Sequence, residues 1–236
     1  MSRCDDSLPL STLLTANHFA GRRRYVRIPL HGCQPLAPRY EFVKRCMDIT
    51  LVLLLAPFAI LVVAVCSALI WLEDGRPVFF WQRRTGRGGR PFYMLKLRTM
   101  VRDADALKKQ LSHLNELAYP DFKIRNDPRV TRVGRVLRRT SLDEVPQLWN
   151  VLIGEMSLVG PRPTSYDATS YELWQTERLE ILPGITGLWQ ISGRSDLEFE
   201  ERVKLDIQYL ERRSIRFDLW ILARTAGAVF SRRGAC

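Results

Sequence analysis

The sequence has few histidines and no closely spaced pair of cysteines, which excludes several kinds of active site. The chain has no Ser-His-Asp set, no His-Glu-x-x-His zinc motif and no Cys-x-x-Cys pair. Its three histidines, His18, His31 and His113, lie outside every polar motif described below. The scattered cysteines predict neither a zinc site nor a disulfide framework, and they indicate a reducing compartment.

Acidic residues are the minority among the charges. Lysine and arginine number 36 against 25 aspartates and glutamates, which gives a net charge of +11. This excess predicts a negatively charged partner: nucleic acid, anionic lipid or a phosphorylated substrate. No recognised nucleic-acid module is present, so we expect no nucleic-acid partner, although a basic membrane-anchored nucleic-acid binder stays open as an alternative. The 236 residues suffice for one domain with a core.

Residues 1–38 lack hydrophobic periodicity and are rich in proline and arginine. We expect this segment to be a poorly ordered basic arm. It does not read as a signal peptide, because no apolar core follows the first basic residues. The arginine cluster from Arg22 to Arg24 lies either against lipid headgroups or in solvent, and the sequence favours neither position over the other.

Charge is absent from Ile49 to Leu72, a run long enough to cross a hydrocarbon core of about 30 Å as a helix. Two features favour a helix that enters the membrane and returns. Pro57 removes a backbone hydrogen bond and kinks the helix, and both flanks of the run are basic. We therefore predict a re-entrant helix over residues 39–75 and a cytoplasmic domain over residues 76–236. A helix that spans the membrane is the alternative.

The densest polar motif centres on the adjacent carboxylates Asp143 and Glu144. Ser141 and Glu144 have the spacing of a capping box, and Pro146 suits only the first turn of a helix. We therefore predict a short helix that begins here and ends near Gly154. The free N–H groups at a helix N-terminus favour ionised carboxylates, which a nucleophile and a magnesium ligand both require.

Arginines stand on both sides of this carboxylate pair. Arg138 and Arg139 precede it, and Arg162 follows it between Pro161 and Pro163. Guanidinium groups bind phosphate through paired hydrogen bonds, so the motif brings carboxylates and phosphate-binding cations together. A capping box alone is more often structural, but a helix cap does not require these arginines. The combination predicts covalent phosphoryl transfer with a carboxylate nucleophile and a divalent ion.

A strand is predicted from Phe92 to Arg98, where alternation places Phe92, Met94, Lys96 and Arg98 on one face. Two cations on one side of a strand suit a diphosphate. Charges that protect an exposed strand edge are the alternative. The glycines at 86–89 predict a turn before this strand, without the Walker spacing of a phosphate-binding loop.

The other segments complete an α+β fold that is mainly helical. It consists of a membrane-dipping helix followed by a compact domain with short strands and interfacial amphipathic helices. We predict a short strand over 77–81, helices over 101–119, 130–137, 197–210 and 215–230, and a turn, a strand and a turn over 183–194.

Residues 140–152 and 156–163 resemble the bacterial sugar transferases known as monotopic phosphoglycosyl transferases. The likeness runs from about residue 39 to about residue 233, and it includes the Lys-Leu-Arg-Thr-Met run at 96–100 and the Pro-Gly-Ile-Thr-Gly motif that opens residues 183–194. Two positions depart from the family pattern. Ala56 replaces the serine before the membrane-helix proline, and Leu182 replaces an arginine.

The resemblance implies that Asp143 attacks the sugar-bearing phosphate of a UDP-sugar and releases UMP. Undecaprenyl phosphate would then accept the phosphosugar, which starts assembly of an exopolysaccharide, capsule or O-antigen. Glu144 would hold Mg²⁺ together with Asp143, or would assist the second attack. The substrate-binding residues that the resemblance implies are Lys96, Arg98, Arg138, Arg162, Gln190 and Arg194.

The resemblance also implies a location and a donor. It places the chain in the bacterial inner membrane with the catalytic domain on the cytoplasmic face, and it allows a homodimer. Residues 187–190 resemble those of members that transfer glucose or galactose, so these sugars are favoured. The alternative reading is a non-catalytic membrane scaffold of a polysaccharide assembly complex.

Overall fold

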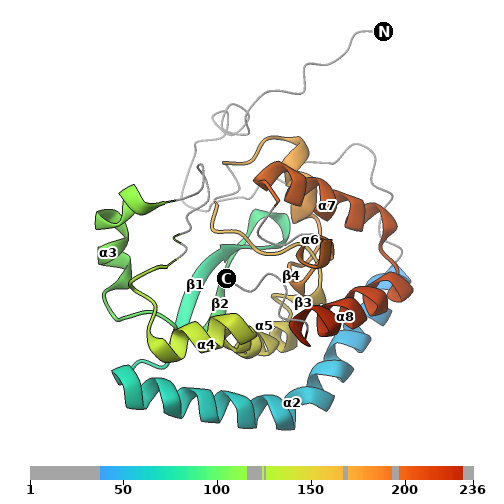
Figure 1. Ribbon diagram of the computed structural model, residues 1–236. Helices are drawn as coiled ribbons and strands as arrows, with labels where there is room; N and C mark the ends of the chain where they lie inside the picture. Colours follow the sequence, from blue (N-terminus) through green and yellow to red (C-terminus); the bar gives the residue numbers. More distant parts are fainter. Residues whose placement is uncertain (1–37, 116–123, 125, 167–169, 193–196, 231–236) are drawn as a thin grey trace, which may run out of the picture.

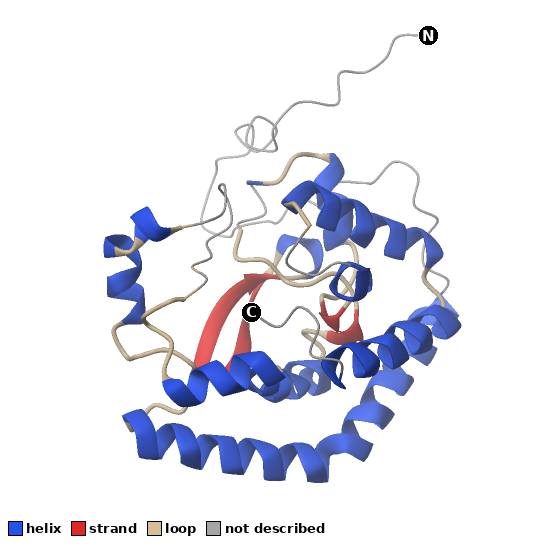
Figure 2. Cartoon of the chain, viewed as in Figure 1, coloured by secondary structure: helices blue, strands red, loops and turns tan. Residues whose placement is uncertain are grey.

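Helices surround two small sheets in the computed structural model, which describes residues 38–115, 124, 126–166, 170–192 and 197–230 (Figure 1). The α+β, mainly helical class predicted from the sequence is confirmed. Figure 2 shows the helices on the outside and the strands near the middle. Residues 1–37 of the predicted basic arm and Arg194 lie outside the described residues, and residue 38 begins a helix.

One long helix, α2 (Pro38–Asp74), runs along one edge of the molecule. It is long and apolar enough to cross a membrane by length and composition. Pro57 lies inside it, and the helix continues on both sides of the proline. Figure 1 shows α2 changing direction along its course, which is the behaviour expected of a helix that contains a proline.

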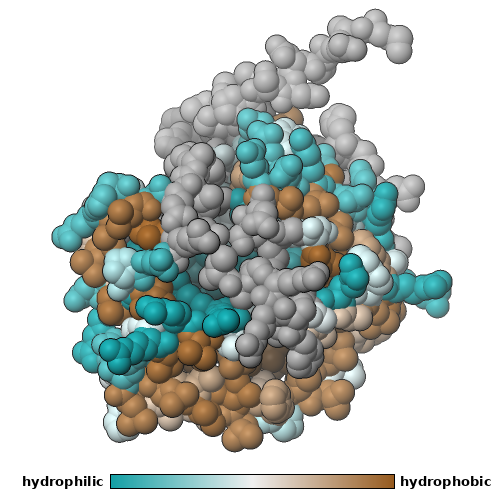
Figure 3. All heavy atoms as spheres, in the orientation of Figure 1, coloured by the Kyte–Doolittle hydropathy of each residue, from teal (hydrophilic) through white to brown (hydrophobic). Residues whose placement is uncertain are grey.

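Apolar side chains of α2 point away from the rest of the protein. Leu54 is 75% exposed and Leu72 is 73% exposed, and Phe58, Ile60 and Leu61 are exposed between them. Figure 3 shows this hydrophobic surface along the lower edge of the molecule. Apolar exposure of this extent is unusual for a soluble surface and typical of a membrane-binding one.

Polar side chains of α2 fasten the helix to the rest of the fold. Buried Asp48 accepts hydrogen bonds from the Ser157 hydroxyl at 2.6 Å and from the Leu158 N–H at 3.3 Å. Arg45 donates to the carbonyls of Val151 and Leu152 at the end of α5 (Leu148–Ile153), where a helix leaves its last carbonyls without partners.

The end of α2 nearest its N-terminus is fastened to α8 (Ile215–Phe230) by charge. Lys44 lies 2.9 Å from the Asp218 carboxylate, and the Tyr40 hydroxyl donates to the same oxygen at 3.0 Å. Asp218 is fully buried, and its other oxygen accepts from the Tyr209 hydroxyl at 2.6 Å. The first half of α2 is therefore fixed in position relative to the rest of the protein.

A β-hairpin follows α2 and consists of β1 (Phe79–Thr85) and β2 (Pro91–Leu97). Strand β1 is longer than, and shifted from, the strand predicted over 77–81. The turn between the strands contains the short helix η2 (Arg87–Gly89), where Gly88 and Gly89 adopt positive φ angles that favour glycine. The turn predicted here from the glycines is confirmed.

The second sheet is small and parallel, with β3 (Ser157–Val159) beside β4 (Gly184–Thr186). A Cβ atom at Gly184 would lie 2.1 Å from the Gly160 nitrogen, so only glycine fits between the two segments. Part of the stretch 183–194, predicted as turn, strand and turn, is instead a helix, α6 (Leu188–Ser192), which packs against α7 (Phe199–Arg212) and α8. The packing stabilises a helix at these residues, although the glycines on either side of them predicted turns.

The remaining helices follow the predicted order with different lengths. Within the described residues, α3 (Ala104–Gln110) and η3 (Ser112–Leu114) replace one helix over 101–119, and α4 (Arg132–Thr140) begins at the Thr131 cap. The amphipathic face predicted over 197–210 buries Val203 and Leu210. The main core joins α2, the hairpin, β3 and α5 to α8 through Val52, Phe92, Met94, Val151, Met156, Val159, Leu188, Tyr209 and Ile221, and Ile185 of β4 packs against it.

Helix α4 passes unusually close to the chain after β2. A Cβ atom at Gly134 would lie 2.1 Å from the Thr99 carbonyl oxygen. We expect Gly134→Ala to lower the free energy of unfolding by about 1–3 kcal/mol, because the backbone would have to move. Gly227→Ala in α8 meets open space and should be neutral or stabilising by up to about 1 kcal/mol. Thermal unfolding of both variants in one detergent checks this, and equal behaviour of the two would contradict the close packing.

Candidate active site

The carboxylate pair is carried by η4 (Leu142–Gln147), a 3₁₀ segment between α4 and α5. Ser141 has a φ angle of 57°, a left-handed conformation that ends α4, and its side chain makes no capping hydrogen bond. The predicted capping box is therefore wrong, because a capping serine needs an extended backbone. The predicted end of the helical segment at Gly154 is confirmed, with φ at 87°.

Glu144 turns toward two cations instead of toward the backbone. Lys96 Nζ lies 2.9 Å from Glu144 Oε1. Arg162 donates to both carboxylate oxygens, with Nη1 3.1 Å from Oε2 and Nη2 on Oε1. Although burial opposes ionisation, Arg162 and Lys96 hold the pKa of Glu144 well below its usual range. This Lys96–Glu144–Arg162 cluster joins β2, η4 and the loop after β3.

Asp143 is buried beside this cluster, with 8% of its surface exposed. Among the described residues no hydrogen bond to its carboxylate is found, and Lys96, Arg138 and Arg162 act on it through charge. Burial raises its pKa above the ordinary value, and the negative charge of Glu144 adds to this. Desolvation therefore opposes the ionised form of Asp143 that we expected a helix N-terminus to favour.

Arg138 lies in the last turn of α4, and its Nε donates to the Thr99 hydroxyl at 2.9 Å. Its charge lowers the pKa of Asp143, while burial lowers its own. The close packing of Gly134 on Thr99 is what brings this arginine to the carboxylates. Arg139 is exposed on the same helix.

Asn150 in α5 holds the carboxylate segment against the hairpin. Its side-chain oxygen accepts from the Leu95 N–H at 3.0 Å, and its nitrogen donates to the Tyr93 carbonyl at 2.8 Å. One amide side chain thus pairs with the outer edge of β2 as a neighbouring strand would. No pattern in the sequence indicated this contact, which depends on the register of the hairpin.

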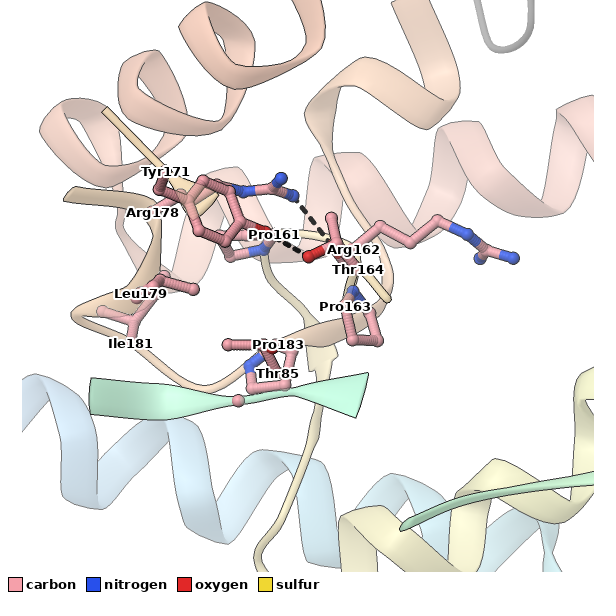
Figure 4. Close-up of a pocket in the computed structure, with 11 residues that line it drawn as sticks. Thr85, Pro161, Arg162, Pro163, Thr164, Tyr171, Arg178, Leu179, Ile181 and Pro183 are labelled. Carbon is pink, nitrogen blue, oxygen red and sulfur yellow. Dashed lines mark hydrogen bonds between the residues drawn. The ribbon is translucent and has the colours of Figure 1, made fainter. Parts of the chain in front are cut away.

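A second arginine, Arg178, fixes the backbone of the loop that carries Arg162. Arg178 Nη2 donates to the Arg162 carbonyl at 2.8 Å, and Arg178 itself pairs with Asp206 of α7 at 2.6 Å. Both members of the pair are almost fully buried. Figure 4 shows the guanidinium group of Arg162 pointing away from the small cavity that Arg178 and Tyr171 line. The sequence alone did not indicate Arg178 or Asp206.

Two predicted substrate-binding residues, Arg98 and Gln190, bond to other parts of the fold, and a third lies outside the described residues. Arg98 is buried at the end of α2, where it bonds the carbonyls of Asp74 and Gly75 and pairs with the Asp74 carboxylate at 2.9 Å. Gln190 lies on α6, and its Nε2 donates to the Ile185 carbonyl at 3.2 Å. Arg194 is outside the described residues.

The two carboxylates of this site differ in how well they suit a divalent ion. The described residues contain no group of three or more acidic, histidine or cysteine side chains. Mg²⁺, however, is commonly held by one or two carboxylates together with substrate phosphates. Asp143 fits this role, because no hydrogen bond from a described residue occupies its carboxylate. Glu144 fits it less well, since Lys96 and Arg162 already engage both of its oxygens.

Comparison with known proteins places the chain in a family. A family model described as bacterial sugar transferase matches residues 39–232. The chain is 42% identical over 201 residues to the exopolysaccharide production protein ExoY of Rhizobium meliloti, which covers 81% of this chain and 87% of that protein. The chain belongs to the bacterial sugar transferase family.

Two other relatives are longer than this chain. Galactosyl transferase CpsE of Streptococcus agalactiae is 47% identical over 165 residues, covering 69% of this chain and 37% of that protein. Undecaprenyl-phosphate galactose phosphotransferase of Salmonella typhimurium is 40% identical over 206 residues, covering 83% of this chain and 42% of that protein. The chain therefore spans less than half the length of these two relatives and most of the length of ExoY.

The Arg178–Asp206 pair generates a stability prediction. Burial raises the pKa of Asp206 to about 6, although Arg178 opposes this. Arg178→Ala should lower the free energy of unfolding by about 3–5 kcal/mol, because Asp206 is left buried without its partner. The loss should be larger at pH 8 than at pH 5, since removing the cation raises the Asp206 pKa further and the protonated form tolerates burial.

Denaturant unfolding at the two pH values measures this effect. Adding Asp206→Ala to Arg178→Ala should recover part of the loss, because no unpaired charge remains. Arg212→Ala, at the exposed end of α7, removes a cation with little expected cost and serves as the control. A loss for Arg178→Ala that is independent of pH would contradict the assigned role of Asp206.

Proposed function

We propose that this protein transfers a sugar-1-phosphate from a UDP-sugar to undecaprenyl phosphate through a covalent intermediate on Asp143. The observation that carries the proposal is a buried carboxylate to which no described residue hydrogen-bonds, beside an ion cluster of Lys96, Glu144 and Arg162. Such a carboxylate is a better nucleophile than one bound by hydrogen bonds, and the surrounding cations suit a phosphorylated substrate.

In the first half-reaction an oxygen of Asp143 attacks the phosphorus that bears the sugar. The new bond joins that oxygen to phosphorus, and the bond from phosphorus to the bridging oxygen of the diphosphate breaks. The electron pair stays on the bridging oxygen, which leaves as part of UMP. Arg138 and the cations of the Lys96–Glu144–Arg162 cluster would offset the phosphate charge. When bound, Mg²⁺ would supply further neutralisation of the phosphates.

In the second half-reaction the phosphate of undecaprenyl phosphate attacks the same phosphorus and releases Asp143. The lipid product carries a diphosphate between lipid and sugar. The position of η4 supports this step, because η4 and α4 both contact α2, the helix suited to a membrane. We propose that α2 dips into the bacterial inner membrane, with the site on the cytoplasmic face at the level of the lipid headgroups. A homodimer remains a prediction.

The names of the relatives support the donor and the pathway. One is named UDP-galactose-lipid carrier transferase and another UDP-glucose:undecaprenyl-phosphate glucose-1-phosphate transferase. We propose glucose or galactose as the transferred sugar and the start of exopolysaccharide, capsule or O-antigen assembly as the role. A covalent route suits these substrates, because one is soluble and the other is embedded in lipid.

The proposed nucleophile is tested by measuring UMP release. Purified protein in nanodiscs with undecaprenyl phosphate and Mg²⁺ should release UMP from UDP-glucose or UDP-galactose. Asp143→Asn should reduce the rate by at least about 1000-fold, because an amide cannot form the intermediate. Asp103→Asn, at an exposed position before α3, changes the same functional group and should retain activity. If folded wild-type protein released no UMP from any UDP-sugar, the scaffold alternative would be favoured.

The pKa of Asp143 predicts how the first half-reaction depends on pH. Because burial raises this pKa, the rate should begin to fall at a pH above the ordinary range of a carboxyl group, as Asp143 becomes protonated. Arg138→Gln removes a charge that lowers the pKa, so the fall should move to higher pH in the residual activity. Arg139→Gln removes an exposed charge on the same helix and should leave the profile in place. The measurement is kcat/KM for the UDP-sugar against pH, and a shift to lower pH in Arg138→Gln would refute the argument.

A further inference from the structure

Arg84 is a third cation near the ion cluster, on the same face of the hairpin as Lys96. Strand register pairs Phe80 with Lys96 and Arg84 with Phe92, so Lys96 and Arg84 lie on one face. Arg84 Nη1 donates to the Ser165 hydroxyl at 2.6 Å, and its Nη2 donates to the Gln82 side chain at 2.7 Å. Its Nε is enclosed and makes no hydrogen bond within the described part of the chain.

The partners of Arg84 leave its charge unbalanced. Both are neutral, and among the described residues Arg84 forms no ion pair with a carboxylate. Burial and the positive charge of Arg162 lower its pKa to about 10, which still leaves it protonated at neutral pH. A half-buried cation that forms no ion pair costs free energy, so the placement of Arg84 is better explained by a bound anion than by stability.

Attachment of the hairpin to the neighbouring loop does not require Arg84. The Thr85 N–H donates to the Thr164 carbonyl at 3.0 Å, and the Thr85 hydroxyl donates to the Tyr166 carbonyl. These two bonds already join the end of β1 to residues 164–166. Gln82 and Ser165 instead fix the orientation of the guanidinium group, which is how a preorganised anion site is built.

The position of Arg84 relative to the nucleophile suggests which phosphate it meets. Arg138 acts on Asp143, whereas the charges that act most strongly on Arg84 are those of Arg162 and Glu144. The two arginines therefore approach the carboxylate pair from different elements, α4 and β1. In-line displacement at phosphorus puts the leaving oxygen opposite the attacking one. Arg84 is not among the charges that act most strongly on Asp143, so it is better suited to the leaving group than to the attacking carboxylate.

We propose that Arg84, oriented by Gln82 and Ser165, binds the nucleotide phosphate that leaves as UMP. This inference rests on the proposed function. When the bond between the sugar-bearing phosphorus and the bridging oxygen breaks, the electron pair remains on that oxygen, and the UMP phosphate gains negative charge. Arg84 stabilises this charge as it develops. In the second half-reaction UMP takes no part, so Arg84 contributes little to it.

Two exchange reactions separate these half-reactions. The first follows transfer of label from UMP into UDP-sugar without any lipid acceptor, with the UDP-glucose or UDP-galactose that supports UMP release. The second follows transfer of label from a polyprenyl phosphate into polyprenyl-diphosphate-sugar without nucleotide. Arg84→Gln should slow the UMP exchange by about 10- to 100-fold, raise the KM for UMP, and change the lipid exchange by less than about 3-fold. Arg84→Lys should fall between Arg84→Gln and wild type.

Arg83→Gln is the matched control. Arg83 is the adjacent residue, is exposed and points to the opposite face of the hairpin, where it lies across from Tyr93. The Arg83→Gln variant should exchange UMP at the wild-type rate. Equal loss of both exchanges in Arg84→Gln would overturn the inference and make Arg84 a support for the ion cluster. An unchanged UMP exchange in Arg84→Gln would also overturn it. Absence of UMP exchange in wild type would instead reject the proposed covalent function itself.

Discussion

The ion cluster of Lys96, Glu144 and Arg162 is the constraint on which the rest of the site depends. Its three members come from β2, η4 and the loop after β3, segments that are distant in sequence. A carboxylate buried with a single cation would be costly, but Glu144 accepts hydrogen bonds from two. Other contacts hold the two cations in place. The pairing of β1 with β2 positions Lys96, and Arg178 donates a hydrogen bond to the Arg162 carbonyl.

This arrangement gives the two adjacent carboxylates different environments. Glu144 stays ionised because cations surround it, and it fixes those cations in place. Asp143 has no such hydrogen bonds within the described residues, and burial raises its pKa. Environments that push the pKa values of neighbouring carboxyl groups apart commonly assign them different roles. Here the tightly paired group suits positioning and the weakly paired one suits attack on phosphorus.

The sequence predicted the features that depend on local pattern and missed those that depend on tertiary contacts. The apolar run of α2, the amphipathic face of α7 and the glycine at the end of α5 were all readable from spacing. The Ser141 capping box failed because Glu144 forms stronger interactions across the fold. Arg98 sat beside Lys96 in the strand pattern, yet the end of α2 offers it carbonyls and a carboxylate that no local rule indicates.

Attachment of α2 to the segments around the site would link the proposed chemistry to a membrane. Asp48 bonds β3, and Arg45 bonds the last carbonyls of α5, the helix that continues directly from the carboxylate segment. Buried polar contacts of this kind are specific in geometry, because an alternative placement would leave charged groups unpaired. The depth at which α2 sits in lipid would therefore set the height of Asp143 above it. In the proposed reaction, an α2 fastened in this way would let one nucleophile meet a soluble nucleotide and a lipid phosphate in turn without a large movement of the protein.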